Sequence, residues 1–145
     1  IKVFQNCNIG DSKKLESIYS SLNIRHEIKD FFEDMGRYIS QADLIISRAG
    51  ANMVIEICTI GRASILIPLS GSIDNDQYHN ASFLSDKDAC ILYEENIVDP
   101  AFLAKKLEIL FNDKSQIVHM AKQAYESNID IENKKFIEIL EKNYL

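Results

Sequence analysis

The sequence predicts an open α/β fold in which a parallel sheet is wrapped by helices. Short apolar runs of strand length alternate along the chain with stretches whose apolar residues recur at helical spacing. The runs at Asp43–Ser47 and Ala63–Leu69 are almost continuously apolar, which is typical of parallel strands covered on both faces. The 145 residues, with 46% hydrophobic and 26% charged, have the size and composition of one globular domain.

The first part of the chain contains two expected strands and two expected helices. Ile1–Phe4 and Asn23–Ile28 have the apolar pattern of strands. Helices are expected at Ser12–Leu22 and, over a shorter span, at Asp34–Gln41. The apolar face of the first helix consists of Leu15, Ile18, Tyr19 and Leu22.

The middle of the chain contains the strongest strand and helix signals. After the strand at Asp43–Ser47, the segment Arg48-Ala49-Gly50 breaks the apolar run, and a helix is expected at Ala51–Ile60. Because this helix is apolar nearly all round, we expect it to be buried. Gly61 suits its C-terminal cap, and the next strand is expected at Ala63–Leu69.

Three further elements and a helical tail complete the chain. A helix is expected at Gln77–Lys87, a strand at Ala89–Tyr93, and a helix that begins at Asp99-Pro100, where Asp is an N-cap residue and Pro suits the first turn. The core stripe of this last helix is Leu103, Leu107 and Leu110. In the tail, Ser115–Leu145, one helical stretch has Val118, Ala121 and Ala124 on its apolar face and the other has Phe136, Ile137 and Leu140.

Charge and cysteine usage exclude several classes of function. A net charge of −6 has the wrong sign for a protein that neutralises nucleic-acid phosphates, so we expect no nucleic-acid partner. The three cysteines, Cys7, Cys58 and Cys90, form no CxxC pair, and the last two have the apolar neighbours of buried thiols, which favours a reducing cytoplasm. No spacing of His and Cys suggests a metal site, and no run is long enough to span a bilayer. The first residue, Ile1, already lies in a strand-like run, so we expect a piece of a longer chain.

The loops at the carboxyl ends of the strands are the expected ligand sites. The small residues at Ala49–Ala51 precede a helix whose free N–H groups and dipole attract phosphate oxygens, although such a turn can also merely pack a helix on a sheet. Glu56 is the only charged residue between Gly50 and Gly61 and suits a ribose diol. The alternative is a carboxylate at a partly exposed edge of the helix or paired with a nearby Arg. The loop at Ser70–Ala81 is rich in groups that bind sugar hydroxyls, but the same residues are common in surface turns.

Three motifs in this order resemble the C-terminal half of the MurG family, the peptidoglycan UDP-N-acetylglucosamine (UDP-GlcNAc) transferases of glycosyltransferase family 28. Phe31–Met35 resembles F-[IV]-x-[DN]-M, Ser47–Glu56 resembles RSGAxTxxE, and Asp74–Ala81 resembles D-x-x-Q-x-x-N-A. The segment Val3-Phe4-Gln5-Asn6 is similar to the end of a family strand, without its histidine and glycine. The resemblance implies a Rossmann-like domain, the C-terminal half-domain of a GT-B glycosyltransferase.

That family transfers GlcNAc from UDP-GlcNAc to the C4 hydroxyl of the MurNAc unit in lipid I, with inversion, at the cytoplasmic face of the bacterial inner membrane. The resemblance implies no cofactor and no metal at the diphosphate. It implies that residues 1–145 are an incomplete donor-binding domain, and that the acceptor lipid and the membrane surface contact a further domain that this chain lacks. No catalytic residue is expected here, and the chain alone is expected to be inactive.

Carried over residue by residue, the resemblance assigns a donor contact to each motif. The Phe32 backbone and Met35 would flank the uracil, and Glu56 would hold the ribose hydroxyls. The helix start would line the phosphates and GlcNAc, and Gln77 would bind GlcNAc hydroxyls. The helix-start contacts are Gly50, Ala51, Asn52 and Met53.

The chain departs from the family pattern at Ala49, where the family has Ser, at Met53, where it has Thr, and at Asp76, commonly Gln or His. We expect these changes to remove a hydroxyl near the phosphates and to alter the sugar pocket. Two other functions remain open. One is a donor-binding subunit of a two-chain lipid-linked GlcNAc transferase, and the other is a sugar-nucleotide epimerase, which would be expected to have a Gly-Gly pair at the helix start.

Overall fold

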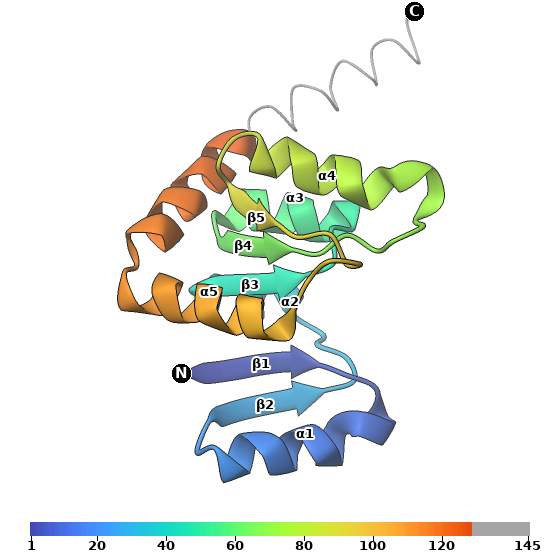
Figure 1. Cartoon of the computed structure of the whole chain (residues 1–145), viewed down its shortest axis with the longest axis vertical. Helices are drawn as coiled ribbons and strands as arrows, with labels where there is room; N and C mark the ends of the chain where they lie inside the picture. The colour runs from blue at the N-terminus through green and yellow to red at the C-terminus, as the bar shows by residue number, and fades with distance from the viewer. Residues whose placement is uncertain (129–145) are drawn as a thin grey trace, which may run out of the picture. The chain divides into compact units, whose positions relative to one another are not determined.

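The computed structural model describes residues 1–128, which divide into two compact units between Tyr38 and Ile39. The first unit contains β1 (Lys2–Asn6), α1 (Ile9–Ser21) and β2 (Arg25–Lys29). β1 and β2 pair in parallel, with Lys2 opposite Arg25 (Figure 1). α2 (Met35–Gln41) begins in this unit and ends in the second.

The second unit is built around a three-stranded parallel sheet in the order β3-β4-β5. Leu44 of β3 lies opposite Ala63 of β4, and Ser64 of β4 lies opposite Cys90 of β5. A helix follows each strand, and residues 115–128 form a further helix after α5 (Figure 1). The elements are β3 (Leu44–Ser47), α3 (Ala51–Ile60), β4 (Ala63–Leu66), η1 (Ile73–Asn75), α4 (Asp76–Ser85), β5 (Cys90–Leu92) and α5 (Pro100–Asn112).

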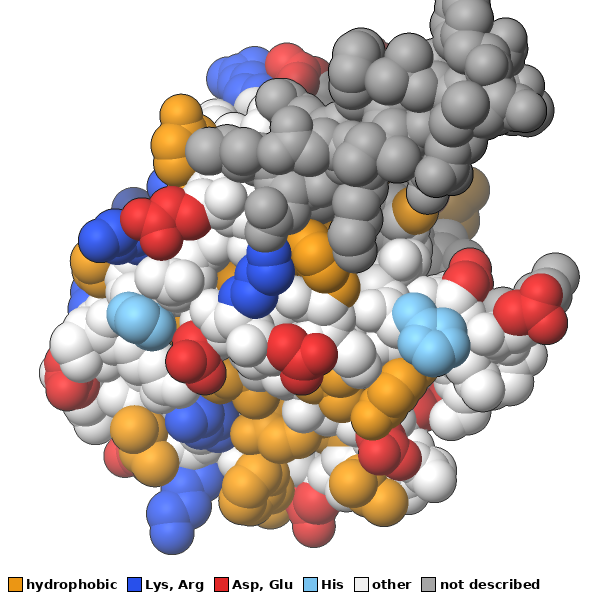
Figure 2. Space-filling view, turned by 90° about the horizontal axis from the view of Figure 1, so that it is seen from above, with side chains coloured by type: hydrophobic (Ala, Val, Ile, Leu, Met, Phe, Trp, Pro, Cys, Tyr) orange, Lys and Arg blue, Asp and Glu red, His pale blue; other side chains and the backbone are white. Residues whose placement is uncertain are grey.

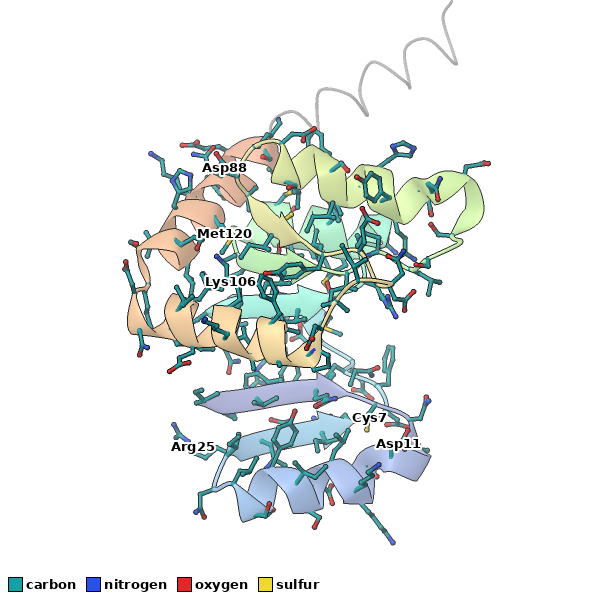
Figure 3. The ribbon with its side chains drawn as sticks, viewed as in Figure 1. Cys7, Asp11, Arg25, Asp88, Lys106 and Met120 are labelled. Atoms are coloured by element: carbon teal, nitrogen blue, oxygen red, sulfur yellow. The ribbon has the colours of Figure 1, made fainter. Side chains whose placement is uncertain are left out.

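The central strand β4 is covered on both faces, because its side chains alternate between two apolar clusters. Ala63 and Ile65 belong to a cluster with Leu110 of α5 and with the helix at residues 115–128. Leu66 belongs to the other cluster, which contains residues of α3 and α4. Met120, 2% exposed and labelled in Figure 3, packs in the same cluster as Ala63 and Ile65. Helices on both faces explain why β4 reads as a continuous apolar run.

Several local predictions are confirmed. The sheets are parallel, and α3 has the predicted bounds, Ala51–Ile60. Gly61 caps α3 in the left-handed conformation, with φ 71°. The Asp99 carboxylate accepts a hydrogen bond of 2.7 Å from the Ala101 N–H and so caps α5, which begins at Pro100. Cys58 and Cys90 are buried, and burial raises the pKa of these thiols to about 11 and about 12.

Other predictions need correction. The structure has two separate sheets where one was expected. α1 begins at Ile9 rather than Ser12, because Asn8 already has the extended backbone of an N-cap residue. β4 ends at Leu66 rather than Leu69, since Pro68 has no N–H to donate to a ladder.

The predicted apolar faces of two helices are also partly wrong. Ile18 of α1 is 44% exposed, and Leu22, the C-cap residue that follows the helix, is 62% exposed. In the helix at residues 115–128, Val118 is 67% exposed, whereas Ile117 and Met120 face the core. The other two predicted residues are confirmed, since Ala124 is fully buried and Ala121 packs against the core, so only Val118 is wrong. The second helical stretch of the tail, with Phe136, Ile137 and Leu140, lies outside the described residues.

The described surface mixes charged and apolar side chains. Figure 2 shows one face, on which acidic and basic side chains are interspersed with hydrophobic ones. Within residues 1–128 we find no helix that combines the length and apolarity required to cross a membrane.

α3 offers a matched pair of isoleucines to test the core. Ile57 is fully buried and Ile55 is 40% exposed on the same helix. We expect Ile57→Ala to lower the free energy of unfolding by about 2–5 kcal/mol, because it leaves a cavity in the core. Ile55→Ala, which leaves none, is expected to cost less than about 1 kcal/mol. Urea unfolding of both variants measures the difference, and equal losses would contradict this account of the core.

Candidate functional site

The turn between β3 and α3 leaves the start of the helix open. Gly50 is the N-cap residue and has φ −63° and ψ 146°, a conformation open to any residue. A Cβ built on Gly50 would meet nothing within 4 Å. The absence of a side chain here is therefore demanded neither by the backbone nor by packing, and it leaves room for a ligand.

The first amides of α3 are available to that ligand. The first intrahelical bond runs from the Val54 N–H to the Gly50 carbonyl, at 3.1 Å. The N–H groups of Ala51, Asn52 and Met53 precede it and have no intrahelical acceptor. Ala51 and Asn52 are exposed and Met53 is half-buried. Free N–H groups and the positive end of the helix dipole together suit an anion such as a diphosphate.

Ala49 does not belong to this open surface. Its side chain is fully buried in the core cluster, and its carbonyl accepts a 3.0 Å hydrogen bond from the Asn80 Nδ2 of α4. The departure from the family serine at Ala49 therefore lies at a core position, and its expected effect at the phosphates stays a prediction. Asn80 instead ties the turn to α4.

Glu56 lies about one helical turn beyond the open amides. Residues four apart share a helix face, so Glu56 lies on the same face as Asn52, about 6 Å further along the axis. The expectation of a helix buried all round is wrong, because Ile55 and Thr59 are exposed, and Glu56 itself is half-buried. Among residues 1–128 its carboxylate has no hydrogen-bond or ion-pair partner, which removes the ion-pair alternative within that range. As far as residues 1–128 are concerned, the carboxylate is free to accept hydrogen bonds from a ligand.

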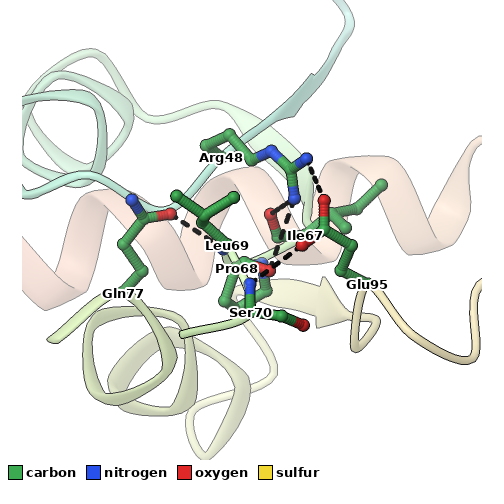
Figure 4. Close-up of polar contacts among 7 residues, drawn as sticks. All are labelled: Arg48, Ile67, Pro68, Leu69, Ser70, Gln77 and Glu95. Atoms are coloured by element: carbon green, nitrogen blue, oxygen red, sulfur yellow. Dashed lines mark hydrogen bonds and ion pairs between the residues drawn. The ribbon is translucent and has the colours of Figure 1, made fainter. Parts of the chain in front are cut away.

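Arg48 connects the loops that follow all three strands of the second unit (Figure 4). Its guanidinium donates to the Ile67 and Pro68 carbonyls after β4, at 3.2 and 3.4 Å, and forms an ion pair with Glu95 after β5. The other oxygen of Glu95 accepts a 2.9 Å hydrogen bond from the Ser70 N–H. The Ser70 N–H and, second, the guanidinium hold the pKa of Glu95 below its usual value.

Gln77 begins the first turn of α4 with its side chain held by the same loop. Its Oε1 accepts a 3.0 Å hydrogen bond from the Leu69 N–H (Figure 4). Just before it, Asp74 and Asn75 have φ of 52° and 55°, in the left-handed region that Asn and Asp enter more readily than other non-glycine residues. Asp76, the third departure from the family pattern, accepts a 2.7 Å hydrogen bond from the Gln77 N–H. The start of α4 is therefore a constrained turn that presents Gln77.

The first unit holds the other predicted contacts. Phe32 is 4% exposed as a whole residue, backbone included, and its ring packs on Tyr38, with centroids 4.4 Å apart. Met35 is half-buried at the start of α2. A pocket of about 390 Å³ lies beside them and is lined by Lys29, Phe31, Glu33, Asp34, Arg37 and Tyr38.

Sequence reasoning missed the parts played by Arg48 and Glu95. Arg48 was interpreted as part of the segment that breaks a strand and of the motif at Ser47–Glu56, without a role of its own, and Glu95 was not singled out. The available signal was their charge: opposite charges that directly follow two parallel strands lie at the same sheet edge. A second pocket, of about 360 Å³, lies at this edge and is lined by Pro68, Leu69, Ser70, Gly71, Asn75, Tyr78, Glu94, Glu95 and Asn96.

Comparison with known proteins identifies relatives of this chain. Transferases named UDP-N-acetylglucosamine--N-acetylmuramyl-(pentapeptide) pyrophosphoryl-undecaprenol N-acetylglucosamine transferase, from Rickettsia felis and Rickettsia massiliae, are each 41% identical to this chain. The alignments cover 78% and 79% of the chain and 31% of each relative, so the chain spans about a third of the length of these curated relatives.

A solved structure gives the same result for the fold. The crystal structure of Acinetobacter baumannii MurG matches with a TM-score of 0.78 and 30% sequence identity, over 87% of this chain and 37% of that one. The family model described as the glycosyltransferase family 28 C-terminal domain matches residues 1–139. The chain therefore belongs to glycosyltransferase family 28, of which it represents the C-terminal domain.

Proposed function

We propose that this chain is the donor-binding part of an inverting transferase that moves GlcNAc from UDP-GlcNAc to lipid I, giving lipid II for peptidoglycan. The Rickettsia relatives carry the name of that reaction. The observation that carries the proposal is the open start of α3 beside Glu56, a half-buried carboxylate with no partner within residues 1–128. A nucleotide sugar supplies a diphosphate for the start of α3 and a ribose diol for Glu56.

In this proposal, the chain binds the donor and stabilises its leaving group. The amides at Ala51–Met53 bind the diphosphate, and Glu56 accepts from both ribose hydroxyls. Gln77 binds the GlcNAc hydroxyls. As the bond from GlcNAc C1 to the diphosphate breaks, negative charge grows on the phosphate oxygens, and the helix start stabilises it. The acceptor C4 hydroxyl attacks C1 from the opposite side, with inversion.

The rest of the enzyme, in this proposal, lies in an acceptor-binding domain. That domain supplies the general base and contacts both lipid I and the cytoplasmic face of the bacterial inner membrane. The uracil contacts of the Phe32 backbone and Met35 are proposed from the family motif alone.

Glu56→Gln tests the ribose contact. If Glu56 accepts two charge-assisted hydrogen bonds, the change should weaken UDP binding to the full-length enzyme by about 1.5–3 kcal/mol, roughly 10- to 150-fold. The melting temperature should change little, because the carboxylate has no protein partner within residues 1–128. Calorimetric titration and thermal unfolding measure the two effects.

The control for loss of one charge is Glu108→Gln, which changes an exposed carboxylate of α5. A lower melting temperature with unchanged UDP affinity would show a structural role instead.

Nucleobase selectivity tests the uracil contact. We expect the full-length enzyme to bind UDP more tightly than ADP or GDP, because the family motif at Phe31–Met35 implies a slot of pyrimidine size. Titration with the three nucleotides at one salt concentration measures this, and equal affinities would refute it.

Metal dependence tests the role of the helix start. Since the N–H groups at Ala51–Met53 and the helix dipole supply the positive potential for the diphosphate, we expect a chelator to leave UDP affinity and transfer unchanged. Loss of activity on chelation, with recovery on adding magnesium, would count against the proposal.

A further inference from the structure

The segment after β4 is held at three residues around Leu69. Arg48 binds the carbonyls of Ile67 and Pro68, and Glu95 binds the N–H of Ser70. Leu69 lies between these anchors, and its own N–H donates to Gln77 (Figure 4). The position of the Leu69 N–H is therefore set by the ion pair of Arg48 and Glu95.

The Leu69 N–H in turn decides which way the Gln77 amide points. A backbone N–H is a donor only, so the Gln77 atom that meets it must be the carbonyl oxygen Oε1. The amide NH₂ group is then the part of Gln77 that remains for a ligand. Without the Leu69 contact, the amide could rotate and present either its donor or its acceptor.

We propose that Glu95 is a positioning residue for the donor sugar: through Arg48 and Ser70 it holds the Leu69 N–H, and this makes Gln77 a hydrogen-bond donor to the sugar. The inference rests on the proposed function, in which Gln77 contacts GlcNAc. It adds that the sugar oxygen facing Gln77 is an acceptor in this contact.

The exposure of the ion pair argues against a role confined to stability. The side chains of Arg48 and Glu95 are 48% and 32% exposed. Pairs at this exposure contribute little to the free energy of unfolding, because water and salt screen them. The contacts of this pair with Ile67, Pro68 and Ser70, by contrast, define where the loop after β4 lies.

The test is a double-mutant cycle at Glu95 and Gln77 in the full-length enzyme. For each variant, the dissociation constants for UDP-GlcNAc and for UDP are measured, and their ratio reports the contact with the sugar. We expect Glu95→Ala to weaken UDP-GlcNAc binding about three- to tenfold, the value of one hydrogen bond, and to leave UDP binding within about twofold. Gln77→Ala should do the same. The double variant should be no worse than Gln77→Ala alone, because both changes remove one contact.

Two further variants make the cycle specific. Gln77→Glu keeps an oxygen for the Leu69 N–H and loses the NH₂ donor, so it should lose the sugar contact as Gln77→Ala does. Glu94→Ala is the control, since Glu94 is the neighbouring carboxylate and has no side-chain partner within residues 1–128. It should leave both dissociation constants unchanged.

The outcomes separate this inference from the proposed function. Equal weakening of UDP and UDP-GlcNAc in Glu95→Ala, additive effects in the double variant, or an unchanged ratio in Gln77→Ala would each overturn the inference. If Glu95→Ala fails to fold, Glu95→Gln, which keeps one acceptor oxygen, replaces it, and failure of both would show a purely structural role. If the unmodified enzyme binds neither UDP nor UDP-GlcNAc, the proposed function itself is wrong.

Discussion

The ion pair of Arg48 and Glu95 holds together three loops that would otherwise leave the sheet independently. Beyond the last ladder bonds of parallel strands, carbonyl and N–H groups lose their regular partners. Arg48 supplies donors to two such carbonyls after β4, and Glu95 supplies an acceptor to an N–H in the same loop. Because the turn before α3 begins at Arg48, the same interaction also relates the helix start to the loop that leads to Gln77.

The burial of β4 explains why the ligand-facing groups gather at the edge of the sheet. Helices cover both faces of this strand, so no polar side chain on either face can reach a ligand. What remains accessible is the edge where the strands end, and the free amides of α3 face it. The carboxyl edge is thus the place where this architecture leaves polar groups exposed.

Much of the fold could be predicted because its signals are local. Gly61 in the left-handed cap position and Asp99 followed by Pro100 act within a few residues, and both were identified from the sequence. The open helix start at Gly50 and the isolation of Glu56 were identified in the same way.

The remaining site residues depend on distant partners. Arg48 and Glu95 are 47 positions apart, and the orientation of Gln77 depends on where Leu69 lies after folding. On the helix at residues 115–128 the sequence pattern chose Val118 in place of Ile117 for the core face, since the two are similarly apolar and only packing distinguishes them.

Gly61 gives the far end of α3 a mechanical role. A Cβ on this residue would lie 3.0 Å from the Cβ of Tyr125 and 3.4 Å from the Ala121 carbonyl, and its φ of 71° already excludes most side chains. The helix at residues 115–128 therefore packs directly against the end of α3. A ten-residue helix is a stiff rod about 15 Å long, so a displacement at one end reaches the other almost undiminished. If α3 binds a diphosphate as proposed, the packing of residues 115–128 at Gly61 contributes to where the opposite end of α3, with its free amides, is held.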